Sequence, residues 1–270
     1  MPEEPSISSI KLAIIGGGLA GVTLANALAQ YDHIGVHVYE STPQFFERGA
    51  VVGLAVNAQN ALHHILPQAS ELLENAGGVP MNSTRVMVGT GAYMNQLARD
   101  HTSTKQGLVF HRASLLRELL CPFPEVGLHA NKSDPPQDRS WPLTRELLEA
   151  TLESSLDRAH TQGMIGGTGA GLAIEDAVVL SALLAHVRSA SEIEAAFQAF
   201  SDVRQPRCQK VIDSSRETGN TVCGRHPAAG LDPERLNEAL RTRCQHIHGL
   251  DHDTHKSEAL AKFEAYGETT

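Results

Sequence analysis

Three glycines and one acid near the start of the chain have the spacing that a phosphate-binding turn needs. Gly16, Gly18 and Gly21 form a G-x-G-x-x-G pattern directly after the apolar run Lys11–Ile15. The first glycine permits a tight turn, the second lets the backbone approach a pyrophosphate, and the third lets the helix pack closely on the strand. Glu40 follows 19 residues after Gly21, where a carboxylate accepts hydrogen bonds from ribose hydroxyls. The pattern predicts a site for an ADP-containing dinucleotide, and a glycine-rich turn without a ligand is the alternative.

The elements that position these residues are a strand, a helix and a second strand. Lys11–Ile15 is a short buried strand by composition, Leu19–Gln30 has helical composition, and Gly35–Tyr39 is the second strand candidate. The pyrophosphate of a ligand would lie at the helix N-terminus, where free N–H groups and the helix dipole favour anions. We therefore expect an α/β fold with a Rossmann-like domain.

The rest of the chain is predicted to form strands and helices in its first half and mainly helices in its second half. Short strands are expected at Arg85–Gly89 and Gly107–His111, and residues 122–142 are rich in Pro, Asp, Asn and Ser and predict an irregular connection. A glycine-rich loop spans Gly163–Gly171, and residues 256–270 predict a weak helix with a frayed end. The remaining segments have helical patterns: Asn57–Asn75, Ala113–Leu120, Leu143–Leu156, Leu172–Arg188, Glu192–Phe200, Arg204–Glu217 and Pro233–His246.

Composition narrows the class of protein. The net charge is −9, so binding to nucleic acid through the overall field is not expected. The four cysteines are scattered without a CxxC motif, which favours a reducing compartment, and the acidic, polar first residues do not resemble a signal peptide. The apolar run near the N-terminus is too short to cross a bilayer. We expect a cytoplasmic protein with an oligomeric state that the sequence does not define.

Several further segments are similar to those of FAD-dependent aromatic hydroxylases of the salicylate hydroxylase type, in particular their fungal branch. Arg48-Gly49-Ala50, followed by Gly53 and Asn57, resembles the second segment of that family, and His111–Leu116 resembles its arginine-containing segment. The stretch from Asp157 to Asp176 resembles its second flavin motif. The resemblance also includes the spacing of Arg204 and Arg207 in the helix that follows, and it covers most of residues 10–120 and 157–255.

The resemblance implies a flavin site made of distant residues. Gly53, Arg112 and Asp157 would contact the cofactor, together with Gly169 and Ala170. A glycine loop at a helix N-terminus brings N–H groups and the positive end of the dipole to the pyrimidine edge of a flavin. Where the family has glycine before the acid, this chain has leucine, and the usual proline of the loop is absent. Glu175 and Asp176 would lie in the first turn of the following helix. Acids at that position suit the helix dipole, so we interpret both as structural.

The substrate-binding part of the family pattern is largely missing. Its Asp-Gly segment is not found, and only some 44 residues separate Arg112 from Asp157, too few for a multistranded substrate sheet. We divide the chain into an N-terminal part of the FAD-binding domain at 8–121, an irregular connection at 122–142, a second flavin segment with C-terminal helices at 143–255, and a frayed tail at 256–270. No catalytic residue can be assigned from the sequence.

By resemblance, the function is that of an FAD-dependent monooxygenase. NADH or NADPH would reduce the flavin, and oxygen would hydroxylate an aromatic or polyketide-like molecule in fungal secondary metabolism or aromatic catabolism. The alternatives are a weakly active or non-catalytic remnant and an NAD-dependent oxidoreductase of another class, which the second flavin segment disfavours. No metal is expected, because the cysteine and histidines between residues 244 and 255 fit no compact zinc signature.

Overall fold

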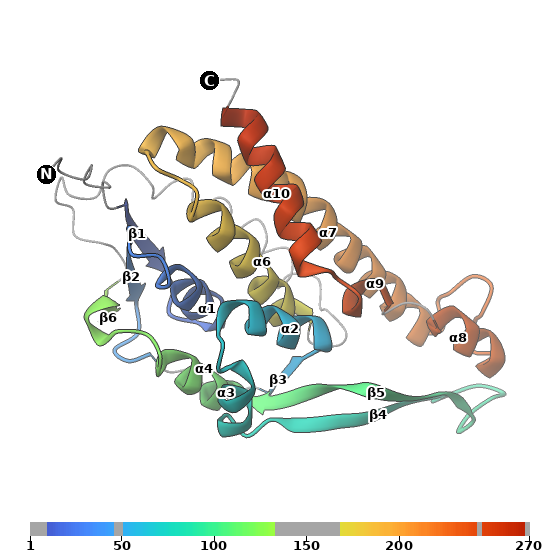
Figure 1. The fold of residues 1–270 in the computed structure, drawn as a ribbon. Coiled ribbons are helices and arrows are strands. Elements are labelled where there is room, and N and C mark those ends of the chain that lie inside the picture. The colour runs from blue at the N-terminus through green and yellow to red at the C-terminus, as the bar shows by residue number, and fades with distance from the viewer. Residues whose placement is uncertain (1–9, 46–50, 133–167, 242–244, 268–270) are drawn as a thin grey trace, which may run out of the picture.

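The computed structural model describes residues 10–45, 51–132, 168–241 and 245–267. These residues form two separate three-stranded sheets and a layer of helices, which confirms the α/β fold (Figure 1). The strands are β1 (Ile10–Ile15), β2 (Ile34–Glu40), β3 (Val51–Leu54), β4 (Val79–Met87), β5 (Leu97–His111) and β6 (Leu128–Ala130). The α-helices are α1 (Leu19–Leu28), α2 (Val56–Ile65), α3 (Ala69–Asn75), α4 (Arg112–Leu120), α6 (Thr168–Leu184), α7 (Ile193–Val222), α8 (Pro233–Leu240), α9 (Gln245–His248) and α10 (His252–Gly267).

The first sheet is parallel and carries the Rossmann-like unit. Its strand order is β1-β2-β6, with Ile10 paired to Ile34 and Val38 paired to Leu128. The connection from β1 to β2 is helix α1, as the sequence predicted. Because the strands are parallel, the glycine-rich turn after β1 and the end of β2 lie at the same edge of the sheet.

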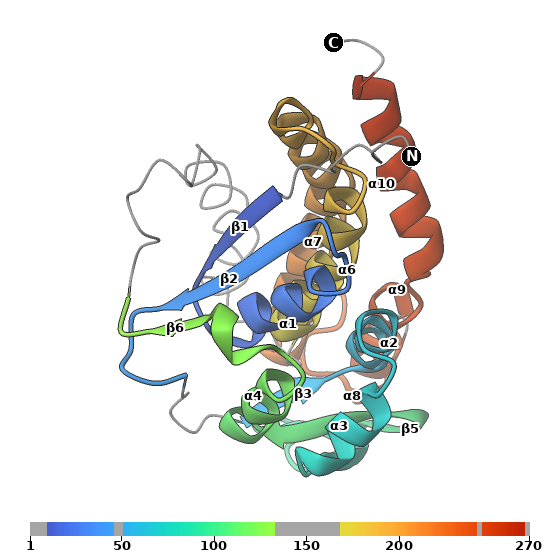
Figure 2. The same cartoon turned by 60° about the vertical axis from the view of Figure 1, so that its left-hand side comes forward.

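Helices continue the core away from this sheet. Helix α6 packs against α1 and α2, and α7 and α10 pack on α6 (Figures 1 and 2). Most residues of α6 are apolar, and Ile174, Val178 and Leu183 are each almost fully buried in the main core. A helix that is largely hydrophobic is typical of the interior of a domain. Helix α6 is therefore the central support for the elements on either side.

The second sheet is antiparallel, with the order β3-β5-β4. Leu54 and Phe110 project from one face into the main core. On the opposite face, Val51 is 73% exposed and Val79 is 63% exposed. Alternate residues of a strand point to opposite faces, so one face of this sheet is buried and the other carries exposed apolar side chains.

Several elements differ from the sequence prediction. The strands expected at Arg85–Gly89 and Gly107–His111 are the longer β4 and β5, and the helix expected at Pro233–His246 ends as α8 at Leu240. The segment 122–142 was expected to be irregular, but Leu128–Ala130 forms β6 beside β2. The pattern Glu192–Phe200 and Arg204–Glu217 predicted two helices, whereas α7 is continuous from Ile193 to Val222 with Pro206 inside it. A proline removes one backbone hydrogen bond from a helix, but buried apolar residues on both sides of Pro206 keep α7 packed on the core.

Two further helical expectations also change. The predicted helix Asn57–Asn75 is divided into α2 and α3, since Leu66 between them is extended. The predicted tail at 256–270 belongs in its described part to α10, which is anchored by the fully buried Ala259 and packs on α6 and α7. The predicted helix Leu143–Leu156 lies outside the described residues. The division of the chain into domains stays a prediction.

Candidate cofactor site

The glycine-rich turn has the geometry that a phosphate-binding turn requires. Gly16 has a φ of +109°, which side chains rarely adopt, and its N–H donates to the carbonyl of Tyr39 at 2.8 Å. A Cβ at Gly21 would lie 2.1 Å from the backbone oxygen of Gly16. The turn therefore needs glycine at the first position for its conformation and at the third for close packing of α1 on β1.

The first N–H groups of α1 donate no hydrogen bond to an N-cap side chain. Gly18 is the N-cap residue and supplies no side chain to bond the first N–H groups of the helix. The first turn also holds no acid that would compete for these groups. A helix N-terminus of this kind binds phosphate through N–H groups and the dipole. The residues present thus fit the pyrophosphate of a dinucleotide.

Glu40 lies at the end of β2, and hydrogen bonds hold its carboxylate beside the turn. The backbone N–H groups of Gly17 and Thr42 each donate to it at 2.8 Å, one to each oxygen. Partial burial alone would raise the pKa of Glu40, but these bonds outweigh burial and lower the pKa. Glu40 is therefore ionised at neutral pH. Its Oε1 also accepts a hydrogen bond from the Ser41 hydroxyl at 3.3 Å, so Oε2, which accepts from Gly17, is the oxygen that keeps a lone pair for a ribose hydroxyl.

The second group of predicted residues lies around β3 and β5. Gly53 pairs with Val109 across the antiparallel sheet, and a Cβ at Gly53 would meet nothing within 4 Å. Arg112 is the first residue of α4, directly after the end of β5, and is half-buried. Since Val51 pairs with His111, the register places Arg112 near the beginning of β3. The sheet thus brings Gly53 and Arg112 to one end of the same strand pair.

The last residues of the predicted glycine-rich loop, from Thr168 onward, belong to α6 itself, and the earlier part of that loop lies outside the described residues. Gly169 and Ala170 lie in its first turn, since α6 begins at Thr168. The next residue, Gly171, packs tightly on α2, where an added Cβ would lie 3.3 Å from the Cβ of Ala58. Helix α2 follows β3 after one residue, so the start of α6 lies beside the segment that carries Gly53. Asp157, the remaining predicted contact, lies outside the described residues.

The predicted site residues that the structure describes therefore lie in two groups, which we call the two halves of the candidate cofactor site. One half consists of Gly16, Gly18, Gly21 and Glu40, which hydrogen bonds and close packing bring together. The other consists of Gly53, Arg112, Gly169 and Ala170, around β3 and the start of α6. The packing of α1 along α6 connects the two halves.

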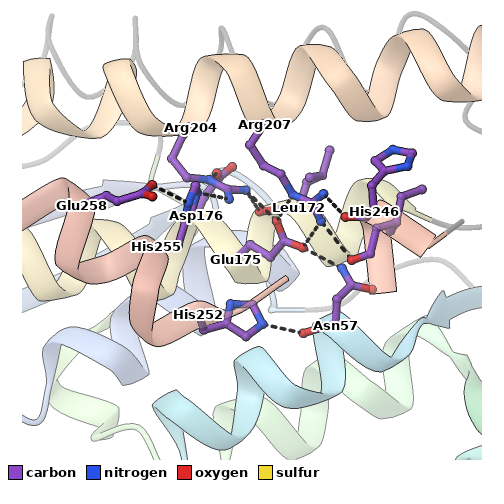
Figure 3. A network of polar contacts seen from close by, with 11 residues as sticks. Asn57, Leu172, Glu175, Asp176, Arg204, Arg207, His246, His252, His255 and Glu258 are labelled. Atoms are coloured by element: carbon purple, nitrogen blue, oxygen red, sulfur yellow. Dashed lines mark hydrogen bonds and ion pairs between the residues drawn. The ribbon is translucent and has the colours of Figure 1, made fainter. Parts of the chain in front are cut away.

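Sequence reasoning missed a buried polar network behind the second half. Glu175 and Asp176 do not lie in the first turn of α6, as predicted from dipole grounds, but in its second and third turns. Both are buried, and both form ion pairs with α7. Figure 3 shows the network, which joins α2, α6, α7, α9 and α10 through the side chains or carbonyls of Asn57, Leu172, Glu175, Asp176, Arg204, Arg207, His246, Ile247, His252 and His255.

The charges of this network balance. Arg204 donates to Asp176 at 2.6 Å and to Glu175 at 3.0 Å, while Arg207 donates to both oxygens of Glu175. Burial would raise the pKa of Glu175, but the two guanidinium groups together lower it. Burial dominates for Asp176 and raises its pKa against the opposing effect of Arg204. The spacing of the two arginines on α7 was the sequence signal for these partners.

The histidines near the C-terminus take part in this network. His252 shares a hydrogen bond with the backbone oxygen of Asn57, and Arg204 donates to His255. In the part of the chain that the structure describes, no three His, Cys, Asp or Glu side chains are arranged to hold a metal ion. None of the described helices combines the length and hydropathy needed to cross a membrane.

Comparisons with known proteins agree with the fold. No protein-family model matches the chain. It is 36% identical over 110 residues to the FAD-dependent monooxygenase SAT7 of Stachybotrys chartarum, a match that covers 40% of this chain and 23% of that protein. It is 36% identical over 107 residues to a salicylate hydroxylase of Pseudomonas putida, covering 39% of this chain and 25% of that one. The matched region thus spans about a quarter of the curated relatives.

Solved structures extend the likeness to most of the chain. A salicylate hydroxylase in complex with its substrate superposes with a TM-score of 0.67 at 16% identity, covering 94% of this chain and 98% of that chain. CtdE, solved with FAD and a substrate, gives the same TM-score at 13% identity, covering 96% and 100%. This likeness shows the fold. The chain is related in sequence to FAD-dependent monooxygenases of the salicylate hydroxylase type and has their fold.

Proposed function

We propose that this chain binds FAD. The single observation that carries the proposal is the turn in which Gly16 and Gly21 have the required conformation and packing while Glu40 is fixed beside them. The start of α1 would hold the pyrophosphate, and Glu40 would accept hydrogen bonds from the ribose of the adenosine part. Gly53, Arg112, Gly169 and Ala170, with Asp157 outside the described residues, would hold the flavin part.

The further proposal is that the bound flavin serves a monooxygenase reaction on a small aromatic molecule. FAD would supply the transfer of electrons from NADH or NADPH to oxygen. The protein would bind and orient the cofactor: the guanidinium of Arg112 offers donors to a phosphate or a flavin carbonyl, and the N-terminal end of α6 would stabilise negative charge on the flavin. The names of the relatives support this class, and fungal secondary metabolism or aromatic catabolism is the proposed setting.

A weakly active flavoprotein is the second candidate, and one observation favours it. On the open face of the second sheet, the apolar side chains of Val51, Val79 and Met81 are exposed, and Met87 and Leu97 are exposed further along β4 and β5. Oxygen that is reduced by a flavin next to such an open face would be released as hydrogen peroxide, because reactive intermediates are protected only where water is excluded.

One experiment separates the two candidates. Purified full chain, loaded with FAD, is supplied with NADH or NADPH and a salicylate-type phenol while cofactor oxidation, hydrogen peroxide and hydroxylated product are measured together. Slow oxidation of the nicotinamide with mostly peroxide as product would favour the weakly active flavoprotein. Tightly coupled hydroxylation would favour the complete monooxygenase, whereas the absence of any nicotinamide oxidation by flavin-loaded protein would contradict both candidates.

A further inference from the structure

Asn57 occupies a position that connects the second half of the cofactor site to the buried network. It is the second residue of α2, three residues after the end of β3, and only 3% of it is exposed. Its side-chain amide donates to Glu175 at 2.6 Å, and its backbone oxygen bonds with His252 at 3.0 Å. In Figure 3 the Asn57 side chain points from α2 towards Glu175 of α6.

Glu175 in turn lies on the same face of α6 as the tight contact with α2. Gly171 precedes Glu175 by four residues, about one helical turn, and a Cβ on Gly171 would lie 3.6 Å from the amide nitrogen of Asn57. On the other side, Arg204 donates both to Glu175 and to the backbone oxygen of Leu172. The first turns of α6 are thus fixed from α2 by one amide and from α7 by guanidinium groups.

We propose that Asn57 is a positioning residue for the N-terminal turn of α6, and through it for the flavin. The inference rests on the proposed binding of FAD. The N–H groups of Gly169 and Ala170 can stabilise a reduced, anionic flavin only if the turn keeps its place. Loss of the amide of Asn57 frees one side of that turn, so cofactor affinity falls and the reduced flavin loses stabilisation.

The amide of Asn57 also allows this role to be tested apart from folding. Its oxygen is buried without a hydrogen-bond partner among the described residues. Asn57→Leu therefore removes one favourable hydrogen bond and one unsatisfied acceptor, two effects on stability that oppose each other. The charges of the network stay balanced, because Glu175 keeps its bonds to Arg204 and Arg207.

Asn26 provides the matched control. It is a second buried asparagine, and its amide joins α1 to α4 through the backbone oxygen of Leu119 at 2.7 Å. Asn26→Leu breaks one long-range helix contact of the same kind, away from the start of α6. A general loss of stability would appear in both variants, whereas displacement of the α6 turn would appear in Asn57→Leu alone.

The experiment compares the wild-type full chain with both variants. With FAD, it measures the dissociation constant, the flavin absorption spectrum and the reduction potential. Without FAD, it measures amide hydrogen exchange over residues 168–172. For Asn57→Leu we expect about tenfold weaker binding, a shifted flavin spectrum, a lower potential and faster exchange. Wild-type values in Asn57→Leu, or equal losses in Asn26→Leu, overturn the inference alone. A wild-type chain that binds no FAD overturns the proposed function and the inference with it.

Discussion

Replacement of Gly21 by alanine adds one methyl group at the most tightly packed glycine of the dinucleotide turn. The new Cβ would lie 2.1 Å from the backbone oxygen of Gly16 and 3.1 Å from Cγ2 of Ile14. A contact of 2.1 Å is more than an ångström too short, and the obstacle is backbone rather than a flexible side chain. Helix α1 must therefore move away from β1, which changes both the core and the proposed phosphate site.

The expected cost follows from the same geometry. Overpacking a core by added methyl groups costs about 1–3 kcal/mol, and a backbone obstacle places Gly21→Ala at or above the upper end of that range. A domain of this size has about 5–15 kcal/mol of stability, so the variant should still fold. Because the N–H groups of α1 move with the helix, FAD affinity should fall at least tenfold.

The assay combines urea unfolding with a fluorescence titration of FAD, and Gly35→Ala is the control. Gly35 lies in β2 of the same sheet, where an added Cβ has its nearest neighbours at 3.8 and 3.9 Å. These are ordinary contact distances, so Gly35→Ala should leave stability and FAD affinity nearly unchanged. If Gly21→Ala unfolds at the wild-type urea concentration and binds FAD equally well, close packing of α1 on β1 is not what the glycine provides.

Three other perturbations should have defined outcomes. Glu40→Ala should weaken FAD binding by about 1–3 kcal/mol in a fluorescence titration, since a charged acceptor is lost, and an unchanged affinity would remove Glu40 from the site. Arg207→Met should lower the free energy of unfolding in urea by about 3 kcal/mol, because the buried charge of Glu175 loses one of its two arginine partners. Adding Glu175→Gln should recover part of that loss. A double variant whose destabilisation equals the sum of the two single changes would contradict this pairing. Burial and the nearby Arg204 hold the pKa of His255 below its usual 6.5, so the unfolded chain binds a proton that the native chain does not, and stability falls as the pH drops below about 6.5. His255→Gln should reduce this slope by at most about 1.4 kcal/mol per pH unit, and an unchanged slope would assign it to other groups.

The dinucleotide turn was predictable because its parts are close in sequence and have local causes. A positive φ at Gly16, a close approach at Gly21 and an acid at the end of the next strand all lie within one strand-helix-strand unit. The apolar patterns of the two strands and of the helix between them predict such a unit from the sequence. The strand β6 was missed because Leu128–Ala130 is too short to show alternation and lies in a segment rich in turn formers.

The buried network was not predictable at the same level. The amide of Asn57 and the carboxylate of Glu175 are 118 residues apart in sequence. The sequence predicts a helix that begins at Leu172 with Glu175 in its first turn, whereas α6 begins at Thr168 and the acid forms an ion pair with α7. Only the packing of α2, α6 and α7 shows that the carboxylate is buried and paired.

The most direct test of the central claim is a titration of the purified full chain with FAD, followed by flavin absorbance and fluorescence, with FMN in parallel. We predict saturable binding of FAD with a shifted absorption spectrum. FMN should bind much more weakly, because it lacks the adenosine and the pyrophosphate that the turn and Glu40 would hold. If the purified protein is colourless and the fluorescence of FAD does not change when the protein is added, the proposal that this chain is a flavoprotein is contradicted.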